Sequence, residues 1–261
     1  MTIEDAAVRV CGTTHVVLPA YNESAALPLL LGRLAELART EKLTVWVVDD
    51  GSSDATAETA ATGVPGLDVR LVRHRVNLGL GQAVQSGLRA VLETAVREDD
   101  IMVVMDADDT HDPALIPRLR AEIAAGADVA ICSRFVVGGD DATAPLGRRL
   151  LSRGAAVLLN HTLRVGDVRD FTSGFRAYRV SLLDRAARHW GERLIEEQGF
   201  ACMVELLLKL RHCQPVITEI PLTLRYDRKQ GASKLRLVRT ITQYLTLLAR
   251  DRLAPAPYRA L

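Results

Sequence analysis

Short runs of consecutive apolar residues alternate, through the first half of the chain, with segments in which apolar residues recur every three or four positions. A continuous apolar run of about four to eight residues is typical of a strand buried on both faces, and the wider spacing is typical of a helix with one buried face. The predicted strands cover residues 15–18, 45–48, 69–74, 101–105 and 129–133. The predicted helices cover residues 24–39, a short stretch after 54, 82–96 and 113–125. This alternation predicts an α/β fold with a mainly parallel sheet and helices on both of its faces.

Three residues mark expected boundaries of these elements. Pro19 follows the first apolar run and is expected to end that strand, because proline cannot donate to a sheet. Ser24 and Asp54 each precede a predicted helix. Their side-chain oxygens are of the kind that caps the first turn, so both are predicted to be N-cap residues.

Polar clusters follow three of the predicted strands, at residues 19–23, 49–53 and 106–109. The carboxyl ends of parallel strands meet at one edge of a sheet, and ligands of open α/β sheets bind in the crevice outside that edge. We therefore expect the three clusters to lie close together, although they are far apart along the chain.

The third cluster contains two carboxylates, Asp106 and Asp108, separated by one alanine. Side chains alternate along a strand, so these two are expected on one side of it. Paired carboxylates favour a hard cation between them, and oxygen ligands suit Mg²⁺ or Mn²⁺, which also bind phosphate oxygens. Such an ion could neutralise a departing diphosphate.

Residues 79–84 resemble half of a dinucleotide-binding fingerprint, GLGQAV. The third glycine is absent, because position 84 is Val, and the motif follows the third predicted strand instead of the first. These departures argue against a nicotinamide or flavin site. The motif is better explained as a tight turn before a helix N-terminus, where a phosphate could bind backbone N–H groups.

Two stretches of the second half are basic. Residues 142–166 carry four arginines and no acidic residue, and residues 234–253 carry five basic residues against one aspartate. Both have apolar residues at helical spacing. A basic amphipathic helix can lie in a membrane interface, or it can dock on the protein core with a solvated basic face. The sequence leaves both interpretations open.

Composition narrows the class of protein. Of the 261 residues, 48% are hydrophobic and 25% are charged, as in a folded globular chain. The formal net charge is +1, which does not suggest a nucleic-acid binder. No apolar run approaches the about 20 residues of a membrane span, and Glu4 and Asp5 stand where a signal peptide would be basic. The four cysteines form no CxxC pair. We expect a cytoplasmic protein, with peripheral contact to a membrane surface as an open alternative.

Taken in order, the motifs resemble those of family 2 glycosyltransferases with a GT-A fold, and most of all polyprenyl-phosphate (dolichyl-phosphate) mannose synthases. The resemblance extends over about residues 14–239. Its pieces are VVLPAYNE (16–23), VVDDGSSD (47–54), NLGLGQAVQSGL (77–88), DADDTHDP (106–113), CSRF (132–135), RDFTSGFRAY (169–178), GF and ELL (199–200, 205–207) and RKQGASKL (228–235). It implies a catalytic domain over residues 1–233 and a basic amphipathic helix over 234–261.

The resemblance also implies roles for single residues. A nucleotide-sugar pocket would be lined by Pro19, Tyr21, Glu23, Asp49, Asp50 and Asp106. Asp106 and Asp108 would hold Mg²⁺ or Mn²⁺ and the donor diphosphate. Thr110 stands where the family pattern has Gln, two residues after the second Asp, and its hydroxyl would reach the metal or a water bound to it.

The acceptor would be bound by a second set of residues. Arg134, Arg148 and Ser152 would hold its phosphate, and Arg228 and Lys234 would close over the diphosphate and the acceptor. The catalytic set implied by the resemblance is Asp106, Asp108, Arg134, Arg228 and Lys234.

The implied reaction is an inverting transfer of a sugar, mannose from GDP-mannose, to a polyprenyl phosphate. A phosphate monoester has a second pKa near 6 and needs no strong general base at about pH 7, whereas an alcohol acceptor does. Family members that act on hydroxyls carry an acidic pair where this chain has Arg169 and Asp170. Two alternatives stay open: a soluble glycosyltransferase with a small-molecule acceptor, and a non-catalytic subunit that binds nucleotide sugars. The sequence does not indicate a protein partner.

Overall fold

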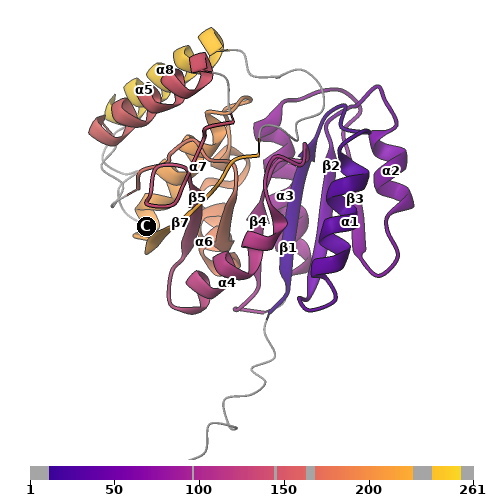
Figure 1. Cartoon of the computed structure of the whole chain (residues 1–261). Coiled ribbons are helices and arrows are strands. Elements are labelled where there is room, and N and C mark those ends of the chain that lie inside the picture. The colour runs from indigo at the N-terminus through magenta and orange to yellow at the C-terminus, as the bar shows by residue number, and fades with distance from the viewer. Residues whose placement is uncertain (1–11, 96, 144–145, 163–167, 226–236, 254–261) are drawn as a thin grey trace, which may run out of the picture.

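One seven-stranded sheet forms the centre of the molecule (Figure 1). The computed structural model describes residues 12–95, 97–143, 146–162, 168–225 and 237–253. The strand order is β3-β2-β1-β4-β6-β5-β7. The bounds of the strands are β1 Thr14–Ala20, β2 Leu43–Asp49, β3 Asp68–Arg73, β4 Ile101–Val104, β5 Val129–Ser133, β6 Arg176–Arg179 and β7 Ile217–Pro221.

The sheet is parallel except at β6, which runs antiparallel to both β4 and β5. The predicted α/β class with a mainly parallel sheet is therefore confirmed. The sequence pattern did not indicate β6. Its four residues, RAYR, include two arginines, and Arg176 is fully buried. An apolar-run criterion cannot find a strand of this kind.

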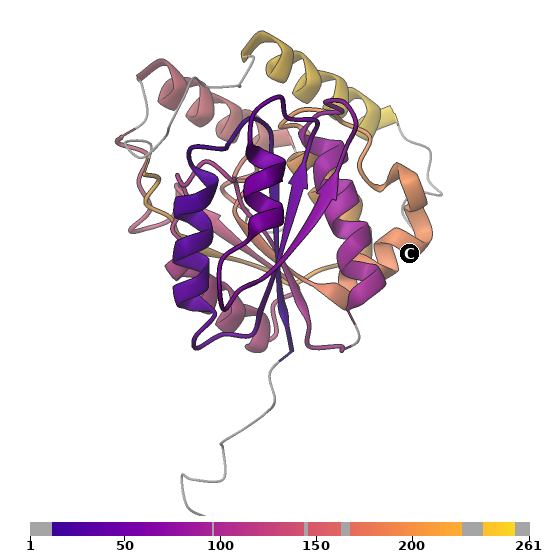
Figure 2. The ribbon, with the colours of Figure 1, turned by 90° about the vertical axis from the view of Figure 1, so that its right-hand side faces the viewer.

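Helices cover both faces of the sheet. Their bounds are α1 Leu27–Leu37, α2 Thr56–Thr62, α3 Leu80–Thr94, α4 Ile116–Ala124, α5 Leu146–Thr162, α6 Val180–Trp190, α7 Cys202–Leu210 and α8 Leu237–Leu253. One hydrophobic core lies under α1, α2 and α4, and the other lies under α3, α6, α7 and α8. Figure 2 shows α1 and α3 on opposite sides of the sheet.

Alternating residues of one strand feed these two cores. Val16 and Leu18 of β1 belong to the core under α1, whereas Val17 belongs to the core under α3. This explains the continuous apolar run. Pro19 does not end β1 as predicted, since it pairs with Val48 inside the strand. The pairing of β1 with β4 stops at Val17, so no ladder bond is lost at the proline.

The predicted helix caps are wrong in detail. The first helix begins at Leu27 with Ala26 as its N-cap, and no side chain caps it. The Ser24 amide instead donates to Asp54 Oδ2 at 3.1 Å. The N-cap of α2 is Ala55, one residue after Asp54, whose Oδ1 accepts the Thr56 amide at 3.0 Å. Both polar residues tie neighbouring loops together at the carboxyl edge of the sheet.

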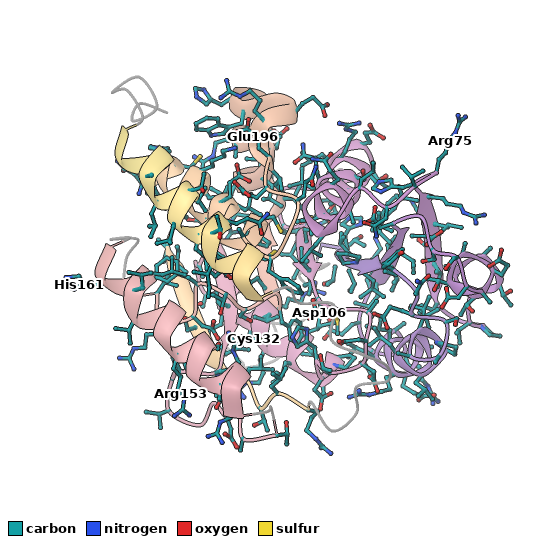
Figure 3. All side chains as sticks on the ribbon, turned by 90° about the horizontal axis from the view of Figure 1, so that it is seen from above. Arg75, Asp106, Cys132, Arg153, His161 and Glu196 are labelled. Atoms are coloured by element: carbon teal, nitrogen blue, oxygen red, sulfur yellow. The ribbon has the colours of Figure 1, made fainter. Side chains whose placement is uncertain are left out.

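The two predicted basic amphipathic helices are α5 and α8, which lie side by side over that edge (Figures 1 and 3). In α8, Tyr244, Leu247 and Leu248 are buried in the core under α3 and α7. Ile241 and Leu245 are exposed on the same helix, as are Val157 and Leu158 on α5. Each helix thus docks one face on the protein and leaves apolar residues outside. Among the described residues, no helix is both long enough and apolar enough to cross a membrane.

Candidate active site

The loops after β1 and β2 are joined by hydrogen bonds at the carboxyl edge of the sheet. The Asn22 amide donates to Ser52 Oγ at 2.9 Å, and the Ser53 amide donates to Asn22 Oδ1 at 2.9 Å. The Glu23 amide donates to Thr56 Oγ1 at 2.8 Å. These bonds confirm that the polar clusters 19–23 and 49–53 lie together, as the strand pattern predicts.

Two consecutive aspartates at the end of β2 have different surroundings. Asp50 accepts hydrogen bonds from the amides of Leu78 and Gly79, at 2.9 and 2.8 Å, and its Oδ1 lies 2.7 Å from His74 Nδ1. Asp49 is fully buried; its Oδ1 accepts the Ser52 amide, and its Oδ2 lies 3.3 Å from Arg73 Nε. Asp50 therefore anchors the segment after β3, and Asp49 connects the loop after β2 to Arg73 of β3.

The backbone of residues 197 and 198 packs closely against the glycine turn at the start of α3. The Gly81 amide donates to the Gln198 carbonyl at 3.1 Å. A Cβ at Gly81 would lie 1.8 Å from the Glu197 carbonyl oxygen, and one at Gly79 would lie 2.5 Å from that of Gln198. Because protein oxygens accept the amides of Leu78, Gly79 and Gly81, the structure does not support the phosphate site that the sequence suggests at this helix N-terminus. The glycines serve close backbone packing instead.

Asp106 and Asp108 lie in a turn beyond β4, which ends at Val104, and not on the strand as expected. The side chain of Asp106 is 37% exposed. Asp108 is buried, and its Oδ1 accepts the hydroxyl of Thr110 at 2.6 Å and the amide of Thr110 at 3.2 Å. Thr110 thus orients the second carboxylate of the pair.

His111 supports this turn from beneath. Its Nδ1 accepts the Asp106 amide at 3.2 Å, and its Nε2 lies 4.0 Å from Asp106 Oδ2. The ring stacks on Phe175, with centroids 5.1 Å apart. Accepting a backbone N–H at Nδ1 places the proton of a neutral ring on Nε2, facing Asp106.

The donor set at this turn suits a divalent cation. The groups are carboxylate and hydroxyl oxygens, which hard cations prefer. A Cβ at Gly174 would lie 3.2 Å from Asp106 Oδ1, so glycine leaves room beside that carboxylate. Within the described residues no three His, Cys, Asp or Glu side chains form a metal cluster. Mg²⁺ usually takes only one or two protein carboxylates, so Asp106 and Asp108 would suffice, with water and phosphate oxygens as the remaining ligands.

Arg134 follows β5 and pairs with the fully buried Asp170. Its Nε and Nη2 donate to the two carboxylate oxygens at 2.8 and 2.7 Å, and Nη2 also donates to Thr172 Oγ1 at 2.6 Å. Burial alone would raise the Asp170 pKa, but Arg134 outweighs this effect and lowers it. Burial likewise opposes the charge of Arg134, and Asp170 nevertheless raises the Arg134 pKa. Both groups stay ionised at neutral pH.

The sequence profile of glycosyl transferase family 2 matches residues 15–186, well over half of the chain. The chain belongs to glycosyl transferase family 2.

Two relatives of this family 2 glycosyltransferase are similar over most of its length. It is 33% identical to a dolichol-phosphate mannosyltransferase of Pyrococcus furiosus over 88% of its own chain and 61% of that protein, so it spans less than two thirds of this relative. It is 34% identical to a polyprenol monophosphomannose synthase of Mycolicibacterium smegmatis, over 89% of its chain and 84% of the relative.

The fold is that of GT-A glycosyltransferases. A crystal structure of glucosyl-3-phosphoglycerate synthase from Mycobacterium tuberculosis, in complex with Mn²⁺ and UDP-glucose, superposes with a TM-score of 0.69. The two chains are 23% identical, and the superposition covers 98% of this chain and 85% of the other. The expected GT-A architecture is therefore confirmed.

The other residues assigned to the acceptor lie on α5 or beyond the described residues. Arg148 belongs to α5, but its side chain is outside the described ones; Ser152 Oγ is buried and makes no hydrogen bond among them. Arg228 and Lys234 lie outside the described residues. The chain enters that segment beside the turn of residues 106–110, which the family resemblance assigns to the metal and which we call the metal turn, since the Arg225 amide donates to the Thr110 carbonyl at 3.1 Å.

Sequence reasoning missed several residues that support the site of this family 2 glycosyltransferase. His74 bridges Asp50 and Ser86, and His111 carries the Asp106 amide. Glu205 is fully buried and accepts the amides of Glu196 and Glu197, which fixes the loop against α3. Only His111 had a sequence signal, because it follows the acidic cluster directly. The partners of His74 lie 24 and 12 residues away and those of Glu205 lie 9 and 8 residues away, and no motif in the sequence marks either set of contacts.

Proposed function

We propose that this enzyme transfers mannose from GDP-mannose to a polyprenyl phosphate, with inversion at the anomeric carbon. The observation that carries the proposal is one loop that contacts both halves of the site. Asp170 and Thr172 of this loop bind Arg134, and Gly174 lies against Asp106. An acceptor phosphate on Arg134 would therefore lie beside the donor diphosphate. The names of the two mannosyltransferase relatives support this donor and acceptor.

In the proposed acceptor site, the guanidinium of Arg134 is held in an orientation that suits phosphate binding. Asp170 and Thr172 take Nε and Nη2 of Arg134, while Nη1 makes no hydrogen bond among the described residues. The Arg134 side chain is 13% exposed, so its charge is only weakly screened by water. Nη1 would hold the acceptor phosphate, with Arg148 and Ser152 of α5 as further contacts.

The surroundings of Asp170 support phosphate over hydroxyl as the attacking group. A hydroxyl acceptor needs a general base. Asp170 is the carboxylate that the sequence offers for this role, but it is fully buried, its pKa is lowered, and it is ion-paired. It cannot take up a proton near neutral pH. A phosphate dianion needs no base, because its attacking oxygen carries no proton. That oxygen would form the new bond to the anomeric carbon as the bond from this carbon to the diphosphate breaks.

The donor half would be assembled from the β1, β2 and β4 loops. Pro19, Tyr21, Glu23, Asp49 and Asp50 would line the nucleoside pocket, with Asp50 acting through the segment that it anchors. Asp106 and Asp108, oriented by Thr110, would hold Mg²⁺ or Mn²⁺, which supplies positive charge to the departing diphosphate. Arg228 and Lys234 would close over the reactants.

The proposal includes binding at the cytosolic surface of a membrane. Four exposed apolar residues on the adjacent helices α5 and α8 are available to acyl or isoprenoid chains. They are Val157, Leu158, Ile241 and Leu245. A helix with one docked face and exposed apolar side chains among basic residues suits an interface with anionic lipid. The helix assigned to residues 234–261 would thus connect the catalytic domain to the lipid.

The test is a transfer assay with purified protein, Mg²⁺ or Mn²⁺, radiolabelled GDP-mannose and a short-chain polyprenyl phosphate. Transfer of the label to a butanol-extractable product would support the proposed donor and acceptor. Loss of this product when EDTA is added would support the requirement for a divalent metal. Release of GDP without lipid product would move the acceptor to a water-soluble phosphate. Donor binding without any turnover, in the presence of both acceptor classes, would favour a non-catalytic sugar-nucleotide-binding subunit.

A further inference from the structure

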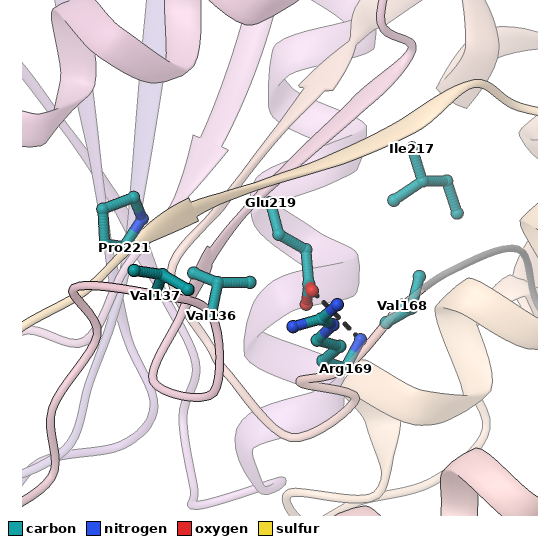
Figure 4. Close-up of a pocket in the computed structure, with 7 residues that line it drawn as sticks. All are labelled: Val136, Val137, Val168, Arg169, Ile217, Glu219 and Pro221. Carbon is teal, nitrogen blue, oxygen red and sulfur yellow. Dashed lines mark hydrogen bonds between the residues drawn. The ribbon is translucent and has the colours of Figure 1, made fainter.

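Glu219 lies on β7, the strand at the edge of the sheet, and its carboxylate accepts two consecutive backbone amides. The amide of Arg169 donates to Oε2 at 3.1 Å (Figure 4). The amide of Asp170 donates to Oε1 at 2.8 Å. Two charge-assisted hydrogen bonds to adjacent peptides fix the backbone at the start of the loop that carries Asp170.

A second set of hydrogen bonds, three in number, continues from this fixed backbone. The Asp170 carboxylate accepts Nε, Nη2 and the backbone amide of Arg134, the last at 3.1 Å. Arg134 therefore receives its orientation from Asp170, and Asp170 receives its position from Glu219. We propose that Glu219 is a positioning residue for the acceptor phosphate, acting through Asp170 on Arg134. The inference rests on the proposed role of Arg134 in binding that phosphate.

The chemistry at position 219 requires a carboxylate. The two amides need two acceptor oxygens, whereas glutamine offers one oxygen and an NH₂ group that would face the second N–H. Burial raises the pKa of Glu219, and hydrogen bonds from Asp170, Arg169 and Ser133 oppose that shift. The same bonds that position the loop thus help to keep the carboxylate ionised.

Glu219 does not belong to the reacting groups. It lines a cavity of about 390 Å³ on the outer side of the loop, together with Val136, Val168, Ile217 and Pro221 (Figure 4). Its carboxylate points to the backbone of residue 169. A defect at this position should therefore change the affinity for acceptor, and not the affinity for donor or the turnover at saturating acceptor.

The experiment compares Glu219→Gln with Thr218→Val in the transfer assay. Thr218 is the neighbouring residue of β7, and its buried hydroxyl makes no hydrogen bond among the described residues, so its removal tests packing alone. We expect Glu219→Gln to raise the KM for polyprenyl phosphate about tenfold, the lower range for loss of an outer-shell partner. The donor KM and kcat should change less than about twofold, and Thr218→Val should match wild type.

A double-mutant cycle with Arg134→Lys tests whether Glu219 acts on the acceptor through Arg134. Lysine keeps the charge but loses the two-pronged contact with Asp170. If Glu219 acts through Arg134, the double variant should have nearly the acceptor KM of Arg134→Lys alone. If the increases in acceptor KM of the two single variants instead multiply in the double variant, the inference is overturned. A wild-type acceptor KM in Glu219→Gln would also overturn it. An unchanged acceptor KM in Arg134→Lys contradicts the proposed function itself. In that case the same double-mutant cycle is measured on the free energy of unfolding. If the losses of stability in the two single variants simply add in the double variant, Glu219 does not act through Arg134 and the inference is overturned.

Discussion

The guanidinium of Arg134 contacts both carboxylate oxygens of Asp170, with Nε 2.8 Å from Oδ2 and Nη2 2.7 Å from Oδ1. Arg134 follows β5, and Asp170 precedes β6, which is the strand hydrogen-bonded to β5. The pair therefore joins two neighbouring loops at the carboxyl edge of the sheet. It also holds one cation at that edge in a single orientation.

Replacing Asp170 by Asn should destabilise the protein strongly. The change leaves the mostly buried Arg134 without its counter-charge, and breaking a buried pair in this way costs about 3–5 kcal/mol. Urea denaturation of Asp170→Asn against wild type measures this difference. Asp184→Asn is the matched control, because Asp184 pairs with the exposed Arg188 on α6 and such pairs contribute less than about 1 kcal/mol. Equal losses in the two variants would contradict the account of Asp170.

Alanine at Asp106 or at Asp108 should reduce kcat roughly 10²-fold or more, because each would remove a group that stabilises charge on the departing diphosphate. Steady-state transfer rates at increasing Mn²⁺ measure the effect. Asp112→Asn is the control from the same loop, since its side chain pairs with Arg33 and caps a short helix. Wild-type turnover in both alanine variants would end the assignment of the metal turn.

His111→Phe tests how the metal turn is supported. The phenyl ring can still stack on Phe175, but the Asp106 amide loses its acceptor at Nδ1. An unsatisfied amide costs about 1–3 kcal/mol, so both the melting temperature and kcat should fall. His189→Phe, at an exposed position of α6, should change neither quantity. Thermal unfolding and initial rates distinguish the two variants, and identical behaviour would contradict a supporting role for His111.

Gly81→Ala should destabilise the protein by several kcal/mol or prevent folding, because a Cβ there would lie 1.8 Å from the Glu197 carbonyl oxygen. Gly32→Ala is the matched helical control. Apart from the neighbouring residues and backbone of its own helix, no atom lies within 4 Å of its Cβ position, so the variant should gain up to about 1 kcal/mol from helix propensity. Chemical denaturation of both variants and wild type measures the free energy of unfolding, which should fall in Gly81→Ala and rise in Gly32→Ala.

Asp54 should make stability depend on acid. Burial alone would raise its pKa, but hydrogen bonds from Thr56 and Ser24 outweigh burial and lower the pKa to about 2. The lowered value means that its contribution is present above the ordinary pKa near 3.8 and is lost as the pH falls toward about 2. Wild type should therefore exceed Asp54→Asn in free energy of unfolding by roughly 1 kcal/mol at pH 6, and the difference should vanish once the pH falls below about 2. A constant difference across that range would contradict this account.

The sequence by itself determined the type of most elements in the first half of the chain and which of its segments are buried. Apolar runs in β1, β2, β4 and β5 meet both cores, so local pattern alone located these strands within a few residues. The same reasoning brought the polar clusters after β1 and β2 to one edge, because parallel strands end together. The roles of Asp106, Asp108, Arg134 and the other assigned residues stay predictions that rest on the family resemblance.

Tertiary structure decided which of these polar groups are already engaged. Asp50 and the N-terminus of α3 satisfy protein amides and carbonyls, and Asp170 is buried against Arg134. Both basic helices dock on the protein while exposing apolar residues. The spacing of apolar residues indicates which face of a helix or strand is buried, and it can be read from a short stretch of sequence. A hydrogen-bond partner is chosen by segments far apart in sequence, such as Glu219 and Asp170, and their approach is set only when the whole sheet has formed.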